Sequence, residues 1–171
     1  SQGAQIIAPG EMGIGGTTAS SALISVFSGL NPEQIVDRGT LINDDALKRK
    51  LTIVNEALTT NNPNREYPLE VLAKVGGLEI AAIVGVFVAA ALHRIPVVVD
   101  GVIASSAALT AKFIAPGCEN FMFASHKSVE KGHRYILDEL NLEPLFDFKM
   151  RLGEASGAMI AMHIIQTASK V

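Results

Sequence analysis

The feature that most constrains the fold is a glycine-rich segment, Gly10-Glu11-Met12-Gly13-Ile14-Gly15-Gly16, between two apolar stretches. Residues 4–8 predict a short strand and residues 17–27 a helix, so the order is strand, loop, helix. Glycines let several backbone N–H groups converge on one anion, and the N-terminus of a helix adds a favourable dipole. The segment therefore predicts a phosphate or nucleotide site that contains a carboxylate. A tight turn without a ligand is the alternative, because the segment lacks the Gly-Lys-Ser/Thr ending of a Walker A loop.

Helical and strand-like patterns alternate along the rest of the chain. Asn43 predicts the N-cap of a helix that ends near residue 59, with an apolar stripe at positions 47, 51, 54 and 58. Further helices are predicted over 67–74, 78–93, 105–114, 130–140 and 159–168, and strands over 95–99 and 121–123. This alternation indicates an α/β fold with a mainly parallel sheet flanked by helices. Ligands of such sheets bind beyond the carboxyl ends of the strands, where Glu11, Asp100 and residues 125–128 are expected.

Composition excludes several classes of protein. With 171 residues and 49% hydrophobic composition, the chain can bury a core, and a net charge of −3 without a long basic run argues against a nucleic-acid surface. The uncharged run Ile80–Leu92 is shorter than the ~20 residues that cross a membrane, which predicts a buried helix instead. Cys118 is the single cysteine, so the chain has no internal disulfide and no cysteine cluster for a metal; a reducing cytoplasm is expected.

A second glutamate lies in a similar setting near the other end of the chain. In Arg151-Leu152-Gly153-Glu154-Ala155-Ser156-Gly157, a carboxylate is flanked by glycine and a hydroxyl residue just before an apolar helix. Glu154 is either an acid favoured by the dipole of that helix or a second functional carboxylate that faces the same cleft as Glu11.

Five segments stand out along nearly the whole chain: Gly10-Glu11-Met12-Gly13-Ile14 with Thr17-Thr18, Lys74-Val75-Gly76-Gly77, Pro96-Val97-Val98-Val99-Asp100-Gly101, Ser125-His126-Lys127-Ser128 through Glu130-Lys131-Gly132, and Met150-Arg151-Leu152-Gly153-Glu154. In the same order, they resemble segments of the nicotinate-nucleotide:dimethylbenzimidazole phosphoribosyltransferase family. The resemblance is to the C-terminal half to two-thirds of that enzyme.

The resemblance implies an enzyme that moves the phosphoribosyl group of nicotinate mononucleotide to dimethylbenzimidazole or a related base, with no metal or other cofactor. It implies a Rossmann-like fold in a homodimer. Residues 1–150 are expected to form part of an α/β phosphoribosyl-binding domain. Residues 151–171 are expected to form the catalytic loop and the start of a C-terminal helical segment that contributes to a small helical domain. The 171-residue piece alone is expected to be inactive.

The resemblance also implies roles for individual residues. Glu154 matches the general base, and Glu11 matches a second active-site glutamate that stabilises positive charge on the ribose. Because like charges raise one another's pKa, one of the two carboxyl groups is expected to have a raised pKa. The phosphate contacts implied are Gly13, Thr17, Gly39, Lys50, Ser128 and Gly153.

Taken without the resemblance, several of these residues have simpler explanations. Lys50 fits a solvated helix lysine and Ser128 a loop cap, while Asp100 either holds sugar hydroxyls or turns the chain. Asp100 and Arg151 are also predicted to be among the residues that bind the substrate and its phosphate. The side chain of Arg151 either orients Glu154 or pairs with Asp147. His126 and His133 are expected to be structural or surface residues.

Three positions depart from the family pattern. Gly16 replaces a common asparagine, Ala155 a usual glycine and His163 a common proline, which leaves the choice of aromatic base open. A non-catalytic nucleotide-binding module and an assembly subunit that uses the alanine-rich helices are the alternative functions. The presence of both glutamates favours the enzyme, because binding a phosphate requires no carboxylate.

Overall fold

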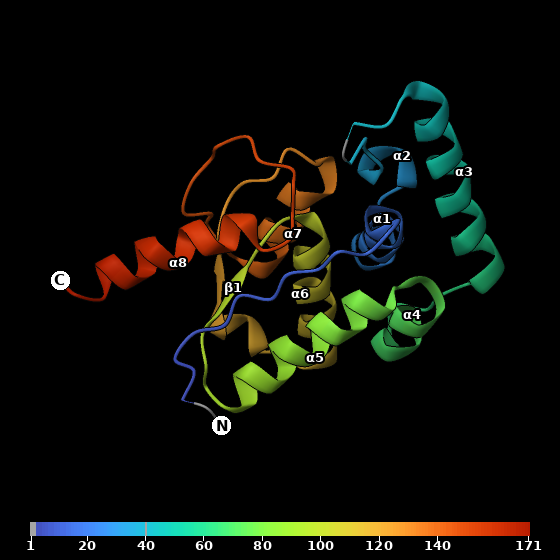
Figure 1. The fold of residues 1–171 in the computed structure, drawn as a ribbon. Coiled ribbons are helices and arrows are strands. Elements are labelled where there is room, and N and C mark those ends of the chain that lie inside the picture. Colours follow the sequence, from blue (N-terminus) through green and yellow to red (C-terminus); the bar gives the residue numbers. More distant parts are fainter. Residues whose placement is uncertain (1–2, 40) are drawn as a thin grey trace.

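The computed structural model describes residues 3–39 and 41–171, which form a mixed α/β fold that is mostly helical (Figure 1). The elements are α1 (Gly16–Ser28), α2 (Pro32–Ile35), α3 (Asp44–Asn61), α4 (Pro68–Val75), α5 (Leu78–Leu92), β1 (Val97–Val99), α6 (Val102–Ile114), the 3₁₀ helix η1 (Cys118–Phe121), β2 (Met122–Ala124), α7 (Lys131–Leu140) and α8 (Ser156–Ala168). The predicted elements are confirmed within a few residues, except the first strand. The short helices α2 and η1 are not among the predicted elements.

The sheet is parallel but small. β1 pairs with β2 in the register Val97↔Met122 to Val99↔Ala124. The expected strand over residues 4–8 is reduced to one parallel bridge at Ile7, whose N–H donates to the Pro96 carbonyl at 3.0 Å and whose carbonyl accepts from Val98 at 2.8 Å. This bridge still places the chain leading to Gly10 beside β1, so the glycine-rich segment begins near the carboxyl end of that strand.

Helix α6 lies at the centre of the core and packs against α1, α5 and α7. Its residues from Ala104 to Ala111 are all buried, and most of them are small, which lets the neighbouring helices approach closely. Large side chains from those neighbours, including Leu23, Phe27, Ile80 and Phe87, are almost completely buried around it. The core therefore fixes the start of α1 and the start of α6, which both border the site described below.

Helix α3 follows its sequence pattern. The side chain of Asn43 accepts a hydrogen bond from the N–H of Ala46 at 2.9 Å, which is the expected N-cap. Val54 is fully buried, and the other members of the apolar stripe, Leu47, Leu51 and Leu58, pack against the core. This docking brings Lys50 in the same helix to the edge of α1.

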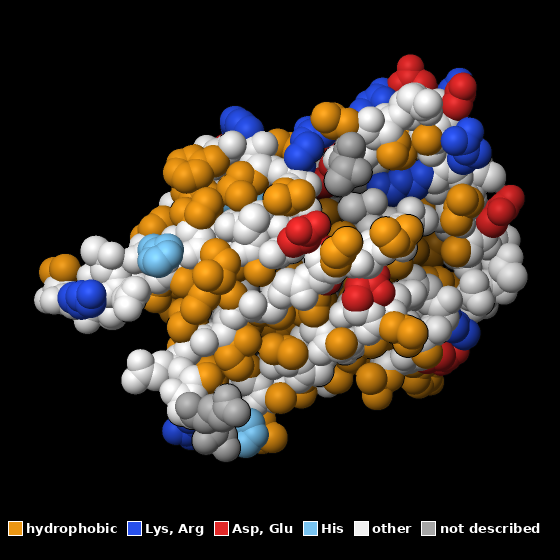
Figure 2. All heavy atoms as spheres, in the orientation of Figure 1, with side chains coloured by type: hydrophobic (Ala, Val, Ile, Leu, Met, Phe, Trp, Pro, Cys, Tyr) orange, Lys and Arg blue, Asp and Glu red, His pale blue; other side chains and the backbone are white. Residues whose placement is uncertain are grey.

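Helix α5 is not the fully buried helix that its composition predicts. Ile80 and Phe87 face the core, but Leu78 is 90% exposed and Leu92 81% exposed. Figure 2 shows hydrophobic side chains gathered over α5 and α4, whereas charged side chains concentrate around α3. Among the described residues no helix combines the length and the apolarity that a membrane crossing needs.

Candidate active site

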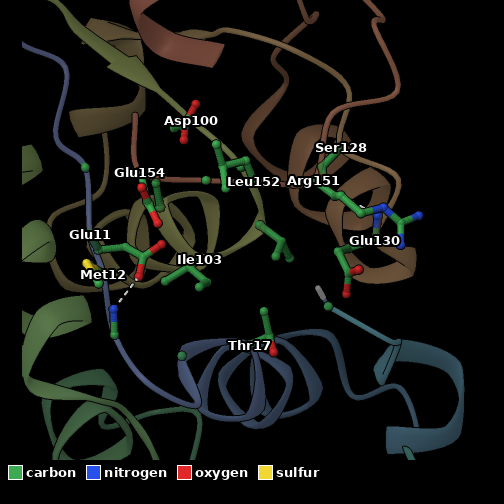
Figure 3. A pocket seen from close by; sticks show the side chains of 18 of the residues that line it. Glu11, Met12, Thr17, Asp100, Ile103, Ser128, Glu130, Arg151, Leu152 and Glu154 are labelled. Atoms are coloured by element: carbon green, nitrogen blue, oxygen red, sulfur yellow. Dashed lines mark hydrogen bonds between the residues drawn. The ribbon is translucent and has the colours of Figure 1, made fainter. Parts of the chain in front are cut away.

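A cavity of about 380 Å³ opens beyond the carboxyl ends of β1 and β2 (Figure 3). Its walls come from segments far apart in the sequence: the loop 10–17, residues 100–104 after β1, residues 126–130 after β2, Gly39, and residues 151–154 before α8. The position agrees with the rule that parallel sheets bind ligands at the carboxyl ends of their strands.

The segments that carry the two glutamates pack directly against each other. A Cβ atom on Gly10 would lie 2.9 Å from the Cβ of Ala155 and 3.0 Å from the carbonyl carbon of Glu154, so only glycine fits at position 10. A Cβ atom on Gly153 would lie 3.2 Å from Oε1 of Glu11. Figure 3 shows the side chains of Glu11 and Glu154 pointing into the same space. The expectation that these glutamates share one cleft is thus confirmed.

Glu11 is held by its own loop. Its Oε2 accepts a hydrogen bond from the N–H of Gly13 at 2.8 Å. Partial burial raises the pKa of the Glu11 carboxyl, and the negative charges of Glu79, Asp100 and Glu154 raise that pKa further, while the Gly13 N–H opposes the rise. The pKa increase expected for one of the paired carboxyl groups is therefore found at Glu11.

The backbone around Glu154 has an uncommon conformation. Gly153, Glu154 and Ala155 have φ values of 80°, 57° and 61°, which place three successive residues in the left-handed region. Residues other than glycine are strained in this region by about 1–2 kcal/mol each, because their Cβ atom lies too close to the backbone. Ala155, where the resemblance predicts a glycine, is one of the strained residues. The turn ends at α8, where Ser156 Oγ donates to the carbonyl of Gly153 at 2.7 Å and closes the turn.

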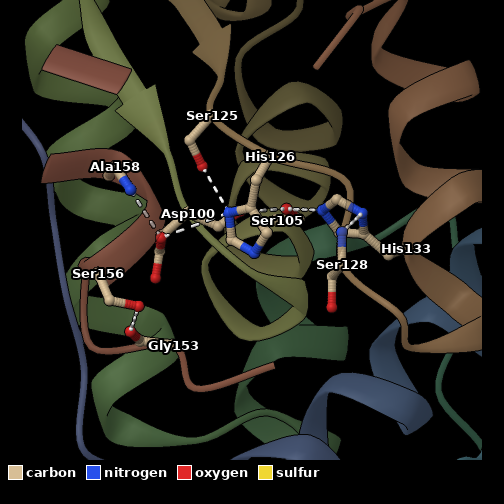
Figure 4. Close-up of polar contacts among 9 residues, drawn as sticks. All are labelled: Asp100, Ser105, Ser125, His126, Ser128, His133, Gly153, Ser156 and Ala158. Atoms are coloured by element: carbon tan, nitrogen blue, oxygen red, sulfur yellow. Dashed lines mark hydrogen bonds and ion pairs between the residues drawn. The ribbon is translucent and has the colours of Figure 1, made fainter. Parts of the chain in front are cut away.

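Asp100 anchors the helix that follows Glu154 (Figure 4). It is 2% exposed, and its Oδ1 accepts a hydrogen bond from the N–H of Ala158 in the first turn of α8 at 2.9 Å. The same oxygen lies 3.8 Å from Nδ1 of His126. A Cβ atom on Gly157 would approach that nitrogen to 2.0 Å, so glycine is required for this contact. Asp100 thus joins the end of β1 to the first turn of α8, which neither expected role included; it also lines the cavity, and its contact with sugar hydroxyls stays a prediction.

His126 and His133 are each 1% exposed, so a surface role is excluded for both. Nδ1 of His133 accepts a hydrogen bond from the N–H of Ser128 at 3.2 Å, so Nε2 carries the proton and donates to Ser105 Oγ at 3.0 Å. Burial, with a smaller effect of His126, lowers the pKa of His133 to about 4. Burial also lowers the pKa of His126, against the opposing effect of Asp100 and Asp147. The neutral His133 ring fixes the backbone of Ser128.

The side of the cavity away from the two glutamates carries both signs of charge. Ser128 and Glu130 line it and are almost fully buried, and the Gly39 backbone stabilises the charged form of Glu130. Burial and the charge of Asp37 raise the pKa of Glu130, whereas Lys50 and Arg151 lower it. We call this region the mixed-charge end (Gly39, Ser128, Glu130, Arg151 and Lys50). We call the opposite region the acidic end (Glu11, Asp100 and Glu154).

Lys50 is 6% exposed, so it is not a solvated helix lysine. Its Nζ donates to Thr17 Oγ1 at 2.9 Å and to the Asp37 carbonyl at 2.8 Å, which leaves one of three N–H donors for another partner. Burial lowers the pKa of Lys50, and the charges of Glu130 and Asp37 oppose that effect. Lys50 does not itself line the cavity; Thr17, which it contacts, does.

Arg151 occupies neither of the two positions expected for it. Asp147 pairs with Lys149, at 2.7 Å from carboxylate to Nζ. Figure 3 shows the Arg151 guanidinium beside Glu130, on the opposite side of the cavity from Glu154. The interpretation of Arg151 as a partner of Asp147 or Glu154 is therefore wrong, and its charge belongs to the mixed-charge end.

Apart from Lys50, every site residue expected from the sequence lines this one cavity: Glu11, Gly13, Thr17, Gly39, Asp100, Ser128, Arg151, Gly153 and Glu154. Sequence reasoning missed Glu130 and an apolar part of the wall that Met12, Ile14, Ile103 and Leu152 form. Met12, Ile14 and Leu152 are 81%, 99% and 60% exposed. They lie in loops, where no periodic pattern of apolar residues indicates which side chains are exposed, so their position in the cavity wall could not be predicted. In the described part of the chain, no group of three or more His, Cys, Asp or Glu side chains is placed to hold a metal ion.

Comparison with known proteins agrees with this geometry. The sequence profile of one family, described as Phosphoribosyltransferase, matches residues 1–171. The chain belongs to this phosphoribosyltransferase family. A relative from Geotalea uraniireducens, named nicotinate-nucleotide–dimethylbenzimidazole phosphoribosyltransferase, is 48% identical over 99% of this chain and 48% of its own length. The protein of the same name from Clostridium acetobutylicum is 47% identical over 98% of this chain and 47% of its own length.

Solved structures of phosphoribosyltransferases show the same fold. The crystal structure of CobT from Thermus thermophilus superposes with a TM-score of 0.94 at 43% identity, over 99% of this chain and 50% of that one. A second structure, of a nicotinate-nucleotide-dimethylbenzimidazole phosphoribosyltransferase from the same organism, gives a TM-score of 0.90 at 41% identity, over 99% of this chain and 49% of that one. The chain thus spans about half the length of the curated relatives it matches.

Proposed function

We propose that the intact protein transfers the phosphoribosyl group of nicotinate mononucleotide to 5,6-dimethylbenzimidazole or a related aromatic base. The products are α-ribazole 5′-phosphate and nicotinate, and the reaction belongs to assembly of the cobamide lower ligand. The observation that carries the proposal is the pair Glu11 and Glu154 facing one cavity whose other end carries cations, buried hydroxyls and glycine N–H groups. The names of the relatives support the same reaction.

At the acidic end, Glu154 is proposed as the general base. A benzimidazole nitrogen attacks C1′ of the ribose, the bond from C1′ to the nicotinate nitrogen breaks, and nicotinate leaves with the bonding electrons. The other benzimidazole nitrogen becomes acidic as positive charge develops, and Glu154 accepts its proton. The charge of Glu11 stabilises the positive ribose in the transition state, and its raised pKa marks the carboxylate as poorly compensated before the substrate binds.

At the mixed-charge end, we place the phosphate group. The N–H of Gly39 and the hydroxyls of Thr17 and Ser128 provide donors of the kind that phosphate binds. Gly13 and Gly153 remain proposed phosphate contacts on the side toward Glu11, where the Gly13 N–H is bonded to the Glu11 carboxylate before a substrate binds. Lys50, through its remaining donor, and Arg151 supply positive charge. Asp100 acts by seating α8, which fixes the turn that presents Glu154.

The apolar part of the wall suits the aromatic substrate. Met12, Ile14 and Leu152 expose most of their side chains where they border the cavity, and Figure 3 shows Ile103 beside Glu11. A flat aromatic ring packed on this surface would be held next to Glu154 and would remove apolar area from water.

The wider organisation of the enzyme is part of the same proposal. Residues 1–150 belong to a Rossmann-like α/β domain that binds the phosphoribosyl group, with the parallel strands β1 and β2 in its sheet. Residues 151–171 provide the catalytic loop and the start of a small helical domain. The intact enzyme works as a cytoplasmic homodimer without a metal or other cofactor, and the 171-residue chain alone is inactive because its base pocket is incomplete.

One experiment separates this proposal from a non-catalytic nucleotide-binding module. The intact protein is incubated with nicotinate mononucleotide and dimethylbenzimidazole, and nicotinate release is followed for the wild type and for Glu154→Gln. We expect release by the wild type and a large loss in the variant. Binding of the nucleotide without any release by the wild type would favour the module, and no binding at all would favour an assembly role.

A further inference from the structure

Glu130 lies where the proposed function places the phosphate. It lines the cavity together with Gly39, is only 8% exposed, and the Gly39 backbone stabilises the charged form of its carboxyl group. Its own N–H donates to Ser128 Oγ at 3.4 Å. Gly39 and Ser128 are both proposed phosphate partners. A carboxylate therefore lies among the donors, and occupies part of the space, that a phosphate group would need.

The charges around Glu130 come from three other segments. Lys50 in α3 and Arg151 before α8 stabilise its negative form, and Asp37 after α2 destabilises it. His133, in the first turn of the helix that follows Glu130, is neutral above about pH 5 because its pKa is lowered to about 4. Two cations thus face two carboxylates before a substrate binds. A phosphate monoester, with a second pKa of about 6, brings up to two further negative charges at neutral pH.

We infer that Glu130 is a counter-ion that holds the mixed-charge end together before substrate binds, and that it takes up one proton from solvent when a phosphate group binds there. The inference rests on the proposed function for the position of the phosphate. As a carboxyl group, Glu130 donates its proton to a phosphate oxygen and no longer competes for Lys50, Arg151 and the Gly39 N–H. When two anionic groups lie close together, they commonly share one proton, because both cannot easily carry a negative charge. The hydrogen bond between them is then short and strong.

The test compares nicotinate mononucleotide binding by the intact wild type and by Glu130→Gln at pH 5, 6.5 and 8. Gln keeps the shape and can donate a hydrogen bond, but it needs no proton. We expect the ratio of the wild-type Kd to the variant Kd to be near one at pH 5 and to reach at least about tenfold at pH 8, because each pH unit over which one proton is taken up raises the ratio by a factor of about ten. Glu33→Gln, an exposed carboxylate change on α2, is the matched control and should leave the wild-type pH dependence unchanged.

A second measurement needs no variant. At pH 8 the free phosphate group is fully ionised, so proton uptake on binding, measured by calorimetry in two buffers of different ionisation enthalpy, reports the complex. We expect net uptake that approaches one proton. No uptake, or a Kd ratio that stays constant from pH 5 to 8, would overturn the inference and leave the proposed function intact. Failure of the wild type to bind nicotinate mononucleotide at every pH would overturn both.

Discussion

The two ends of the cavity hold buried or partly buried carboxylates in opposite surroundings. At the acidic end, burial and three other acidic side chains raise the pKa of Glu11, and a backbone N–H from Gly13 is the group that opposes the rise. At the mixed-charge end, burial and Asp37 raise the pKa of Glu130, but Lys50 and Arg151 oppose the rise. The negative charge at the acidic end is therefore uncompensated, whereas at the mixed-charge end Lys50 and Arg151 compensate the charge of Glu130.

This difference assigns a separate task to each end. Uncompensated carboxylates stabilise positive charge that develops during a reaction, and they accept protons. Cations and backbone donors bind an anion before the reaction begins. If the assignment is correct, changes at the acidic end act mainly on kcat, and changes at the mixed-charge end act mainly on binding.

The largest effect is expected from Glu154→Gln. Because general-base catalysis contributes about 10²–10⁴-fold, kcat should fall by about that factor while KM for nicotinate mononucleotide changes little. Steady-state nicotinate release by the intact protein measures both constants, with Glu33→Gln as the control for loss of a surface carboxylate. Unchanged kcat in Glu154→Gln would remove the base from the acidic end.

Lys50→Met tests the other end. A hydrogen bond to a charged group contributes about 1.5–3 kcal/mol, so KM for nicotinate mononucleotide should rise by about 10–150-fold with a smaller change in kcat. Because Lys50 also bonds Thr17 and the Asp37 carbonyl, thermal unfolding of the variant is measured alongside. A fall in kcat at an unchanged KM would place Lys50 in the chemical step and contradict the comparison.

The next effect concerns His133, which supports the mixed-charge end through Ser128. Its pKa is lowered from 6.5 to about 4 in the folded protein, so the unfolded chain binds the proton more strongly. The contribution of His133 to the free energy of unfolding is then fully present above pH 6.5 and decreases as the pH falls toward 4. Between pH 7 and 5 the wild type should lose about 2 kcal/mol more than His133→Gln in denaturant titrations. Parallel pH profiles for the two proteins would show that His133 is not the buried neutral group described above.

The smallest effect is expected from Asn43→Ala, because Asn43 does not line the cavity. Loss of the N-cap of α3 should lower the free energy of unfolding by about 1 kcal/mol. KM and kcat should not change, because the docking of α3 through its apolar stripe still positions Lys50. A raised KM in Asn43→Ala would show that the mixed-charge end depends on the seating of α3 more than on its local contacts.

Much of the fold could be predicted because local signals and tertiary contacts agree. The stripe and cap of α3 and the β-branched strand at Val97–Val99 are examples. The first strand was overestimated because the apolar run at residues 4–8 pairs through Ile7 alone. The exposure of Leu78 and Leu92 could not be predicted, since the apolar composition of α5 is the same on its buried and exposed faces.

The site shows a similar division. Glycine is required at positions 10 and 153 because the two segments that carry the glutamates touch there. The pattern of a carboxylate beside glycine therefore correctly predicted that Glu11 and Glu154 share one cleft. The surroundings of Arg151 could not be predicted, because Asp147 pairs with Lys149 instead and Arg151 lies beside Glu130, which the fold brings from another segment. Glu130 had no signal of its own, because its importance arises from Lys50, Asp37 and Arg151, which the fold brings from other segments.

The most direct test of the two-ended site is the equilibrium binding of nicotinate mononucleotide, measured by calorimetry on the intact wild type, Glu154→Gln and Lys50→Met. The account predicts that Glu154→Gln binds the nucleotide as tightly as the wild type although it no longer releases nicotinate, and that Lys50→Met binds it at least about tenfold more weakly. Equal weakening in both variants, or weaker binding in Glu154→Gln alone, would contradict the division of the cavity into a reacting end and a binding end.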